Sequence, residues 1–324
     1  MHNMEYKHIP VALQRTLELL TPILGRNEKT LFIDTTLGLG GHTQSILENF
    51  PNTIVIGFDR DSSAIKIAEM RLAKFSDRVF LVNQEFDQIA ISLEKLFSEG
   101  KIPTTFISGA LFDLGVSSMQ LDKAERGFSY NNSGPLDMRM DQRSEVSAEI
   151  VVNTYSKSEL IKILTKYGEE KFASKIAENI VNFREKTAIK TTDQLAQIVK
   201  DSIPAPARRQ GGNPAKRTFQ AIRIEVNQEL NLIEKAVPQA LNLLAVGGRL
   251  IILSYQSLED KIVKEIFQEY TEVSDLRGLP VALPNSAAKY KLLTRGSELA
   301  SQSEIELNPR AASLRLRAIE RLAA

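Results

Sequence analysis

The first third of the chain alternates short apolar runs with segments whose apolar residues recur at helical spacing. Four runs, at 30–34, 53–59, 78–82 and 106–114, have the length and composition of buried strands. Segments such as 62–75 lie between them and have one apolar helical face. Strands that alternate with helices form right-handed βαβ units, and near-continuous apolar strands suit a sheet covered on both faces. The pattern predicts an α/β fold with a doubly wound, mostly parallel sheet.

The middle of the chain follows another pattern, with no convincing buried strand between about residues 120 and 214. Residues 156–186 are predicted as one long helix or two shorter ones. They begin at a capping box, in which Ser156 and Glu159 satisfy amides at the helix start. A second capping box, formed by Thr191 and Gln194, begins a further helix. This part is predicted to be a helical insertion.

The α/β pattern resumes after the insertion. Residues 222–244 are predicted as a helix, 246–248 as a turn and 249–253 as a buried strand. Ser257 is predicted to cap the next helix. Residues 313–320 alternate in polarity, which indicates a half-exposed or edge strand that closes the sheet.

These patterns divide the chain into two domains. Residues 1–122 and 216–324 are predicted to form the α/β domain, and residues 123–215 the inserted all-helical domain.

Composition narrows the class of protein. Of 324 residues, 43% are hydrophobic and 25% charged, which is typical of a globular protein. The chain has no cysteine, which excludes disulfides and thiolate metal sites. Its histidines, among them His8 and His42, are too few and scattered for a metal site, so no metal is predicted. With no signal peptide and no membrane-spanning run, a cytoplasmic protein without a membrane partner is expected.

A glycine-rich turn follows the first predicted strand. Gly38, Gly40 and Gly41 lead into a helix whose free amides and close backbone approach suit a nucleotide-like ligand. Asp59 ends the second strand, where a doubly wound fold holds ribose hydroxyls. A dinucleotide and S-adenosylmethionine both fit this arrangement. The dinucleotide fingerprint lacks its third glycine here, and Asp34 would repel a pyrophosphate, so S-adenosylmethionine is favoured.

The fourth predicted strand ends in Asp113. Chemistry in open α/β sheets is located at the carboxyl ends of the strands. A cytosine amino group is a poor nucleophile, and an acceptor such as Asp113 can hydrogen-bond its N–H and expose the lone pair. Asp113 is therefore the candidate catalytic residue. The alternative is an acid that only caps the next turn.

The residues after this strand form a long and specific run, comprising Asp113–Ser118, Gln120–Asp122, Arg126–Ser129 and Gly134–Asp141. It closely resembles the ribosomal RNA small subunit methyltransferase H family, the cytosine-N4 methyltransferases of bacterial 16S rRNA. Further matches are Tyr6–His8, Gly40–His42, Tyr167–Glu170, Arg217–Ala221, Ser257–Asp260 and Asn308–Arg310. The resemblance extends over nearly the whole chain.

The resemblance implies a class I, Rossmann-like methyltransferase fold with a helical domain for substrate recognition. It implies S-adenosylmethionine as cofactor and a cytidine in the decoding centre of 16S rRNA, within the small ribosomal subunit, as substrate. The implied cofactor contacts are Gly40, Gly41, His42, Asp59, Phe86, Asp113 and Gln120. Phe86 and Gln120 come from the resemblance alone. The oligomeric state stays open, a homodimer included.

Two positions depart from the family pattern. The family usually has Ser-Phe-His where this chain has Ser254, Tyr255 and Gln256, and His-Pro-Ala where this chain has Asn213, Pro214 and Ala215. Gln256 is neither a base nor a charge, which excludes a mechanism that needs an imidazole at this position.

RNA contacts are predicted from basic residues, because the overall net charge of +1 does not indicate nucleic-acid binding. Residues 208–223 form a basic segment without acids, which suits phosphate contacts, although a solvated surface explains each residue equally well. Phe128, Tyr130 and Phe219 are candidates for base stacking, with a core position favoured for each. The candidate RNA-binding residues are Arg139, Arg208, Arg209, Lys216, Arg217 and Arg223.

Three alternatives accompany the methyltransferase. The first is a non-catalytic ribosome- or RNA-binding protein that keeps the methyltransferase fold and has lost turnover through changes such as Gln256. The second is a nicotinamide-dependent oxidoreductase, disfavoured by the glycine pattern and Asp34. The third is methylation of cytosine N4 in DNA, disfavoured because the usual Pro-Pro-aromatic element is absent after Asp113.

Overall fold

The computed structural model describes residues 10–208, 212–272 and 288–323, and it divides into two compact units. The first unit comprises residues 1–115 and 230–324, and the second comprises residues 116–229. The second unit is thus wider than the predicted insertion at both ends. It gains residues 216–229 because their helix packs its apolar face, including Phe219 and Ile222, into the core of the helical unit.

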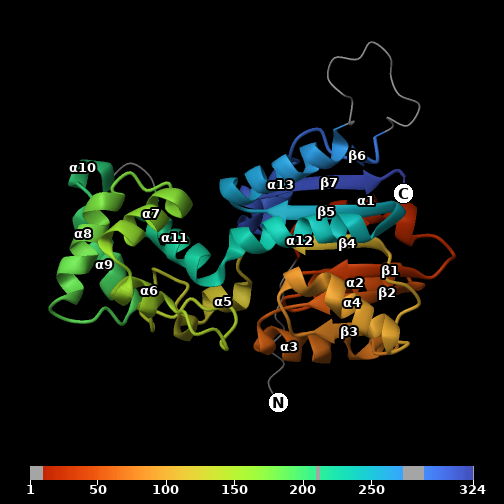
Figure 1. The fold of residues 1–324 in the computed structure, drawn as a ribbon, viewed down its shortest axis with the longest axis horizontal. Coiled ribbons are helices and arrows are strands. Elements are labelled where there is room, and N and C mark those ends of the chain that lie inside the picture. The colour runs from red at the N-terminus through yellow and green to blue at the C-terminus, as the bar shows by residue number, and fades with distance from the viewer. Residues whose placement is uncertain (1–9, 209–211, 273–287, 324) are drawn as a thin grey trace, which may run out of the picture. The chain divides into compact units, whose positions relative to one another are not determined.

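The first unit contains a seven-stranded sheet with the strand order β3-β2-β1-β4-β5-β7-β6, which Figure 1 shows from β3 to β6. The first five strands in this order run parallel, and β7 runs antiparallel to both neighbours. The strands are β1 (Thr30–Asp34), β2 (Thr53–Phe58), β3 (Val79–Val82), β4 (Ile107–Asp113), β5 (Leu244–Ser254), β6 (Tyr290–Leu292) and β7 (Arg315–Arg321). The predicted doubly wound, mostly parallel sheet is confirmed.

Helices connect these strands and cover the sheet. Their apolar faces bury every residue of β1, as predicted for a sheet without a solvated face. One core cluster joins alternate strand residues, such as Phe32 and Leu111, to α1, α2 and α3. The helices of this unit are α1 (Leu13–Leu24), α2 (Gly41–Asn49), α3 (Ser62–Leu72), α4 (Ile89–Ser98), α12 (Glu229–Leu243), α13 (Ser257–Thr271) and α14 (Gln302–Leu307), with Glu229 itself assigned to the second unit.

Three local predictions for the last part of this unit need correction. The predicted half-exposed strand at 313–320 is present as β7, but it is not the edge strand, because β6 pairs with its outer side. Residues 246–248 do not form a separate turn. They lie within β5, which tolerates them because Gly247 adopts a positive φ of 81° and the register with β4 shifts nearby. The predicted helix 222–244 is two helices, since Gln228 between them has a left-handed φ of 49°.

The second unit consists of helices, with one isolated bridge between Pro135 and Thr191 among its described residues. The two capping boxes at Ser156 and Thr191 are confirmed, and the segment 156–186 forms two helices. The helices are α5 (Ser118–Asp122), α6 (Ala148–Thr154), α7 (Lys157–Gly168), α8 (Ala173–Arg184), α9 (Thr192–Ser202), α10 (Ala205–Arg208) and α11 (Lys216–Asn227).

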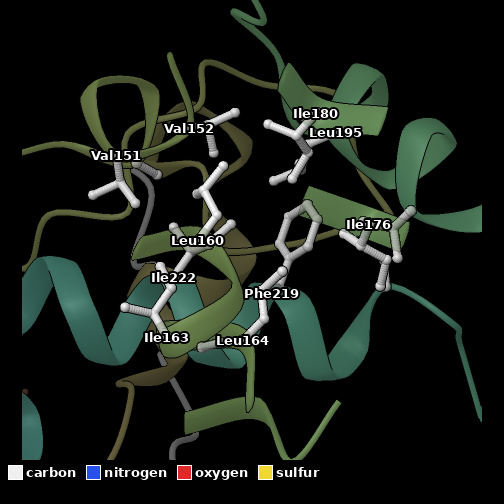
Figure 2. Close-up of a cluster of buried hydrophobic side chains, with 14 of the residues drawn as sticks. Val151, Val152, Leu160, Ile163, Leu164, Ile176, Ile180, Leu195, Phe219 and Ile222 are labelled. Carbon is white, nitrogen blue, oxygen red and sulfur yellow. The ribbon is translucent and has the colours of Figure 1, made fainter. Parts of the chain in front are cut away.

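The helical unit has its own apolar core. Figure 2 shows Phe219 of α11 among aliphatic side chains from the neighbouring helices, including Leu160, Ile176 and Leu195. Each of these three aliphatic residues is fully buried. The second unit therefore has a hydrophobic core formed by its own residues. No helix in the described part of the chain is long and apolar enough to cross a membrane.

Candidate active site

The loop between β1 and α2 forms one wall of the candidate site. Gly38 and Gly40 adopt left-handed φ values of 52° and 76°, which glycine reaches without strain. The amide of Leu37 donates to the carbonyl of Phe58 at 2.8 Å, so the loop is anchored to the end of β2. A Cβ on Gly41 would lie 2.7 Å from Cγ of Pro10, which shows how closely the chain approaches this glycine. The glycines are thus required by the path of the loop.

Asp59 lies directly after β2 and supports the glycine loop. Its Oδ2 atom accepts from the amide of Gly38 at 2.8 Å, and Oδ1 accepts from the amide of Asp61 at 2.8 Å. Burial raises the pKa of Asp59 to about 6, although both amides act in the opposite direction. Asp59, the predicted partner of the ribose hydroxyls, therefore lies at the carboxyl edge of the sheet, as expected. It also holds the glycine loop in place.

Asp34 ends β1 and is almost completely buried. Its Oδ2 atom accepts from the hydroxyl of Thr43 at 2.7 Å, and Oδ1 accepts from the amide of Thr36 at 3.3 Å. Burial raises the pKa of Asp34, a tendency that His42 and these donors oppose and that Asp113 reinforces. The site therefore contains a deeply buried acid close to two further ionisable groups.

His42 begins α2 together with Gly41, and its ring is buried. Its Nε2 atom lies 3.0 Å from the carbonyl oxygen of Val11. A carbonyl only accepts, so Nε2 carries the proton and Nδ1 of the neutral ring is an acceptor. Nδ1 faces Oδ2 of Asp113 at 3.7 Å. Burial lowers the pKa of His42 in spite of the nearby Asp34, which favours this neutral form.

Asp113 ends β4 at the same edge of the sheet. Its amide donates to the hydroxyl of Thr36 at 2.6 Å, and its Oδ1 accepts from the phenol of Tyr255 at 2.7 Å. Burial raises the pKa of Asp113 to about 7, while the hydrogen bond from Tyr255 opposes this rise. The side chain keeps 23% of its surface exposed, so it remains open to a ligand. The structure thus joins Asp113 to His42 and Tyr255.

Sequence reasoning did not select Tyr255 as a site residue. The register of the sheet holds the signal, because Asp113 of β4 pairs with Leu253 of β5. Tyr255 follows Leu253 by two positions and therefore lies at the same carboxyl edge. That pairing joins segments far apart in the chain, so only the tertiary structure brings them together.

Phe86 follows β3 and is partly exposed. Its ring meets the ring of Phe112 edge to face, with centroids 5.6 Å apart. Phe112 is a fully buried residue of β4, so Phe86 is supported by the core. A ring held in this way is suited to stacking on a planar base.

The charge of the site matches a cationic ligand. Among the described residues, neither lysine nor arginine forms an ion pair with Asp34, Asp59 or Asp113. Three carboxylates of this kind suit the sulfonium and ammonium groups of S-adenosylmethionine and its ribose hydroxyls, and they disfavour a pyrophosphate. The described residues contain no cluster of histidines and acids suited to a metal ion.

Comparison with known proteins decides the family. A model of the MraW methylase family matches residues 5–322. The chain belongs to the MraW methylase family. The chain is also 50% identical to the ribosomal RNA small subunit methyltransferase H of Salinispora arenicola, covering 97% of this chain and 83% of the relative. The same protein of Mycobacterium leprae is 50% identical, over 98% of this chain and 85% of the relative.

Solved structures are more distant. An rRNA methylase from Streptococcus thermophilus is 12% identical with a TM-score of 0.43, covering 97% of this chain and 99% of that chain. An O-methyltransferase from Thermotoga maritima is 10% identical with a TM-score of 0.39, covering 99% and 69%. Likenesses this low support no argument. The strand order and family membership establish the class I methyltransferase fold, and the cofactor of the methylase is S-adenosylmethionine.

Gln120 of the methylase is a buried residue of the helical unit. Its Oε1 atom accepts from the amide of Ser117 at 3.1 Å, and its own amide donates to the hydroxyl of Ser117 at 3.3 Å. This reciprocal pair caps α5. The structure gives Gln120 a capping role, and its cofactor contact stays a prediction.

Gln256, where the family usually has a histidine, is the N-cap of α13. Its amide donates to Oε2 of Glu259 at 3.2 Å, and the same oxygen accepts from the amide of Tyr255 at 2.9 Å. The prediction that Ser257 caps this helix was wrong by one residue, because Ser257 already has helical geometry. The side chain of Gln256 donates from Nε2 to Oε1 of Glu259 at 3.3 Å, a structural contact that needs no imidazole.

The candidate RNA-binding residues differ in how they are held. Arg139 forms a bidentate pair with Asp137, and Arg223 forms one with Glu229, with all four N–O distances at 2.9 Å. Lys216 and Arg217 are exposed at the start of α11, and Arg208 is partly buried. Arg209 and His8 lie outside the described residues.

The three aromatic candidates for base stacking belong to the helical unit. Phe128 and Phe219 are buried in its core, and Tyr130 packs against Phe219 with ring centroids 5.7 Å apart. Their positions are explained by packing, as the sequence favoured.

Proposed function

We propose that the chain transfers a methyl group from S-adenosylmethionine to the N4 amino group of a cytidine in the decoding centre of 16S rRNA, within the small ribosomal subunit. The names of relatives about 50% identical support the ribosomal RNA of the small subunit as substrate. The observation that best supports an amino group as the target is the position and accessibility of Asp113. It is a partly exposed acceptor at the carboxyl edge of the sheet, beside the glycine loop.

Asp113 is proposed to hold and deprotonate the substrate amino group. When bound, S-adenosylmethionine supplies a methyl group on a sulfonium, which departs as a neutral thioether. The N4 atom forms the new bond to carbon and loses one proton. Since the pKa of Asp113 is about 7, its carboxylate can accept that proton near neutral pH and return it to solvent.

The remaining site residues are proposed to hold the cofactor. Asp59 accepts from the ribose hydroxyls while it keeps the glycine loop in place. Gly40, Gly41 and His42 would hold the methionine part, and Phe86 would stack on the adenine. Gln120 is proposed as a further cofactor contact.

The helical unit is proposed to bind rRNA. The exposed Lys216 and Arg217 are the best placed phosphate contacts, because Arg139 and Arg223 would first have to leave their carboxylate partners. Arg208 and Arg209 extend the same basic segment. Phosphate contacts of this kind position the RNA and leave base selection to the methyl-transfer site.

The test is methyl transfer from labelled S-adenosylmethionine to small subunits that lack the modification, followed by nuclease digestion and identification of the nucleoside. Label in N4-methylcytidine is expected. Label in another nucleoside would disprove the N4 target. If the protein binds both the cofactor and the subunit yet transfers no label, a non-catalytic binding protein becomes the better explanation.

A further inference from the structure

We propose that Tyr255 is a positioning residue of the methyl-transfer site. Its hydroxyl fixes Oδ1 of Asp113, so that Oδ2 is the atom that accepts the hydrogen bond of the incoming amino group. This inference depends on the proposed function for the identity of that amino group. The hydrogen bond from Tyr255 to Asp113 is itself independent of the substrate.

Tyr255 is held firmly in place from both sides. Its backbone amide donates to Oε2 of Glu259, which is buried with 1% of its surface exposed. Its side chain packs against the cluster that joins the sheet to α1, α2 and α3. Its Cδ2 atom also lies 3.6 Å from where a Cβ on Gly115 would be. A donor fixed in this way loses little entropy when it holds a partner.

The two oxygens of Asp113 are therefore not equivalent. Oδ1 receives the phenol proton at 2.7 Å. Oδ2 faces Nδ1 of His42 at 3.7 Å, and this nitrogen is an acceptor because Nε2 carries the ring proton. Within the described part of the chain, Oδ2 has no hydrogen-bond donor. When Asp113 is ionised, these two acceptors face one another, and an N–H donor from a ligand can bind Oδ2; an exocyclic amino group is such a donor.

The ionisable groups around Tyr255 and Asp113 keep the phenol of Tyr255 protonated, so that it remains a hydrogen-bond donor. Burial raises the pKa of Tyr255 well above 10, and the negative charges of Asp113, Glu259 and Glu304 act in the same direction. Asp34 and His42 are the other titratable groups that face Asp113. The phenol is therefore protonated throughout the range in which Asp113 titrates. Its hydrogen bond favours the carboxylate that burial disfavours.

The test compares the full-length protein with its Tyr255→Phe variant. Phenylalanine is the residue that the family pattern usually has at this position, so the variant is expected to fold. Tyr270→Phe is the matched control, because Tyr270 belongs to the same unit and, among the described residues, its hydroxyl makes one long hydrogen bond, to Asn242 at 3.4 Å. Two profiles are measured from pH 5.5 to 9: the affinity for S-adenosylmethionine without RNA, and kcat/KM for methyl transfer to small subunits.

Loss of the hydroxyl is expected to move the acid limb of both profiles upward by about one pH unit, because the carboxylate of Asp113 loses a donor. At pH 6.5 the variant is expected to be roughly tenfold less active in kcat/KM, and at pH 9 about equal to the unaltered protein. Tyr270→Phe should leave both limbs in place.

An unchanged limb in Tyr255→Phe, with or without a uniform loss of activity, would overturn the proposal, since a role in packing alone predicts that result. If the unaltered protein fails to methylate small subunits, the proposed function fails. The cofactor-binding profile then still decides whether Tyr255 controls Asp113.

Discussion

In the two units of the methylase, the pKa values of buried and partly buried acids are shifted in opposite directions. In the sheet unit, burial raises the pKa of Asp59 to about 6 and that of Asp113 to about 7. In the helical unit, Asp137 is also partly buried, but hydrogen bonds from Arg139 outweigh burial and lower its pKa. Glu229 is likewise held by the guanidinium of Arg223.

This difference separates a binding site from a structural ion pair. An acid with an arginine beside it has its counter-charge built into the fold. An acid without one makes the free protein less stable near neutral pH and leaves its charge for a ligand. In the helical unit these acids are paired within the fold, and in the sheet unit Asp59 and Asp113 have no arginine or lysine partner among the described residues.

The largest expected effect follows from substitution of Asp113. In Asp113→Asn the hydrogen bond with Tyr255 can persist, but the side chain no longer accepts a proton. We expect kcat to fall by about 100-fold or more, with little change in the thermal midpoint. Single-turnover methyl transfer at saturating cofactor measures this effect. Asp77→Asn, which changes an exposed acid of the same unit, is the control. Near-normal turnover in Asp113→Asn would show that solvent removes the proton.

The next largest effect concerns the ion pair between Asp137 and Arg139 in the helical unit. Asp137→Asn should lower the free energy of unfolding by about 1–3 kcal/mol, because Arg139 loses its charged partner. Affinity for S-adenosylmethionine should stay within about threefold. Urea unfolding followed by circular dichroism measures this, since the chain has no tryptophan for fluorescence.

The corresponding substitution in the sheet unit is Asp59→Asn. It is expected to weaken S-adenosylmethionine binding by roughly tenfold or more and to destabilise the free protein less than Asp137→Asn. Equal effects on stability in the two variants would contradict the comparison.

The pH dependence of the free protein gives a smaller effect. Asp59 and Asp113 have folded pKa values above the ordinary value of 3.8, so the folded state binds more protons than the unfolded state between about pH 4 and 7. Their contribution to stability is full below pH 4 and is lost as the pH rises through 6 and 7. We expect this contribution to be roughly 1–3 kcal/mol larger at pH 5.5 than at pH 8.

Cofactor binding should show the opposite trend. A cation stabilises the ionised carboxylates, so affinity for S-adenosylmethionine should rise between pH 5.5 and 8. Calorimetric titration at both pH values checks this. An affinity that does not change with pH would mean that the ionisation of neither carboxylate affects cofactor binding.

The smallest effect concerns RNA. Removing one phosphate contact by Lys216→Ala should weaken subunit binding modestly and reduce the slope of log affinity against log salt by about 1. Lys200→Ala, an exposed lysine of the same unit outside the basic segment, is the control and should leave the slope unchanged. Identical slopes in the two variants would remove Lys216 from the RNA surface.

Local patterns predicted the elements that depend on neighbouring residues. The apolar runs gave β1 to β4, and the capping boxes gave α7 and α9, because these signals act within a few residues. The place of residues 315–321 in the sheet was not predictable. Their alternating pattern indicates a strand, and only pairing with β6 shows that this strand is internal.

The sequence by itself determined the family, the glycine loop and the acids at the strand ends, since each is a property of residue type and short spacing. The tertiary structure decided what those acids do. Pairing of β4 with β5 brings the phenol of Tyr255 to Asp113 across 142 residues, and a carbonyl of Val11 sets which nitrogen of His42 carries the proton. Helix packing assigned α11 to the helical unit. Charge state depends on burial and on partners from distant segments, and only the folded chain supplies both.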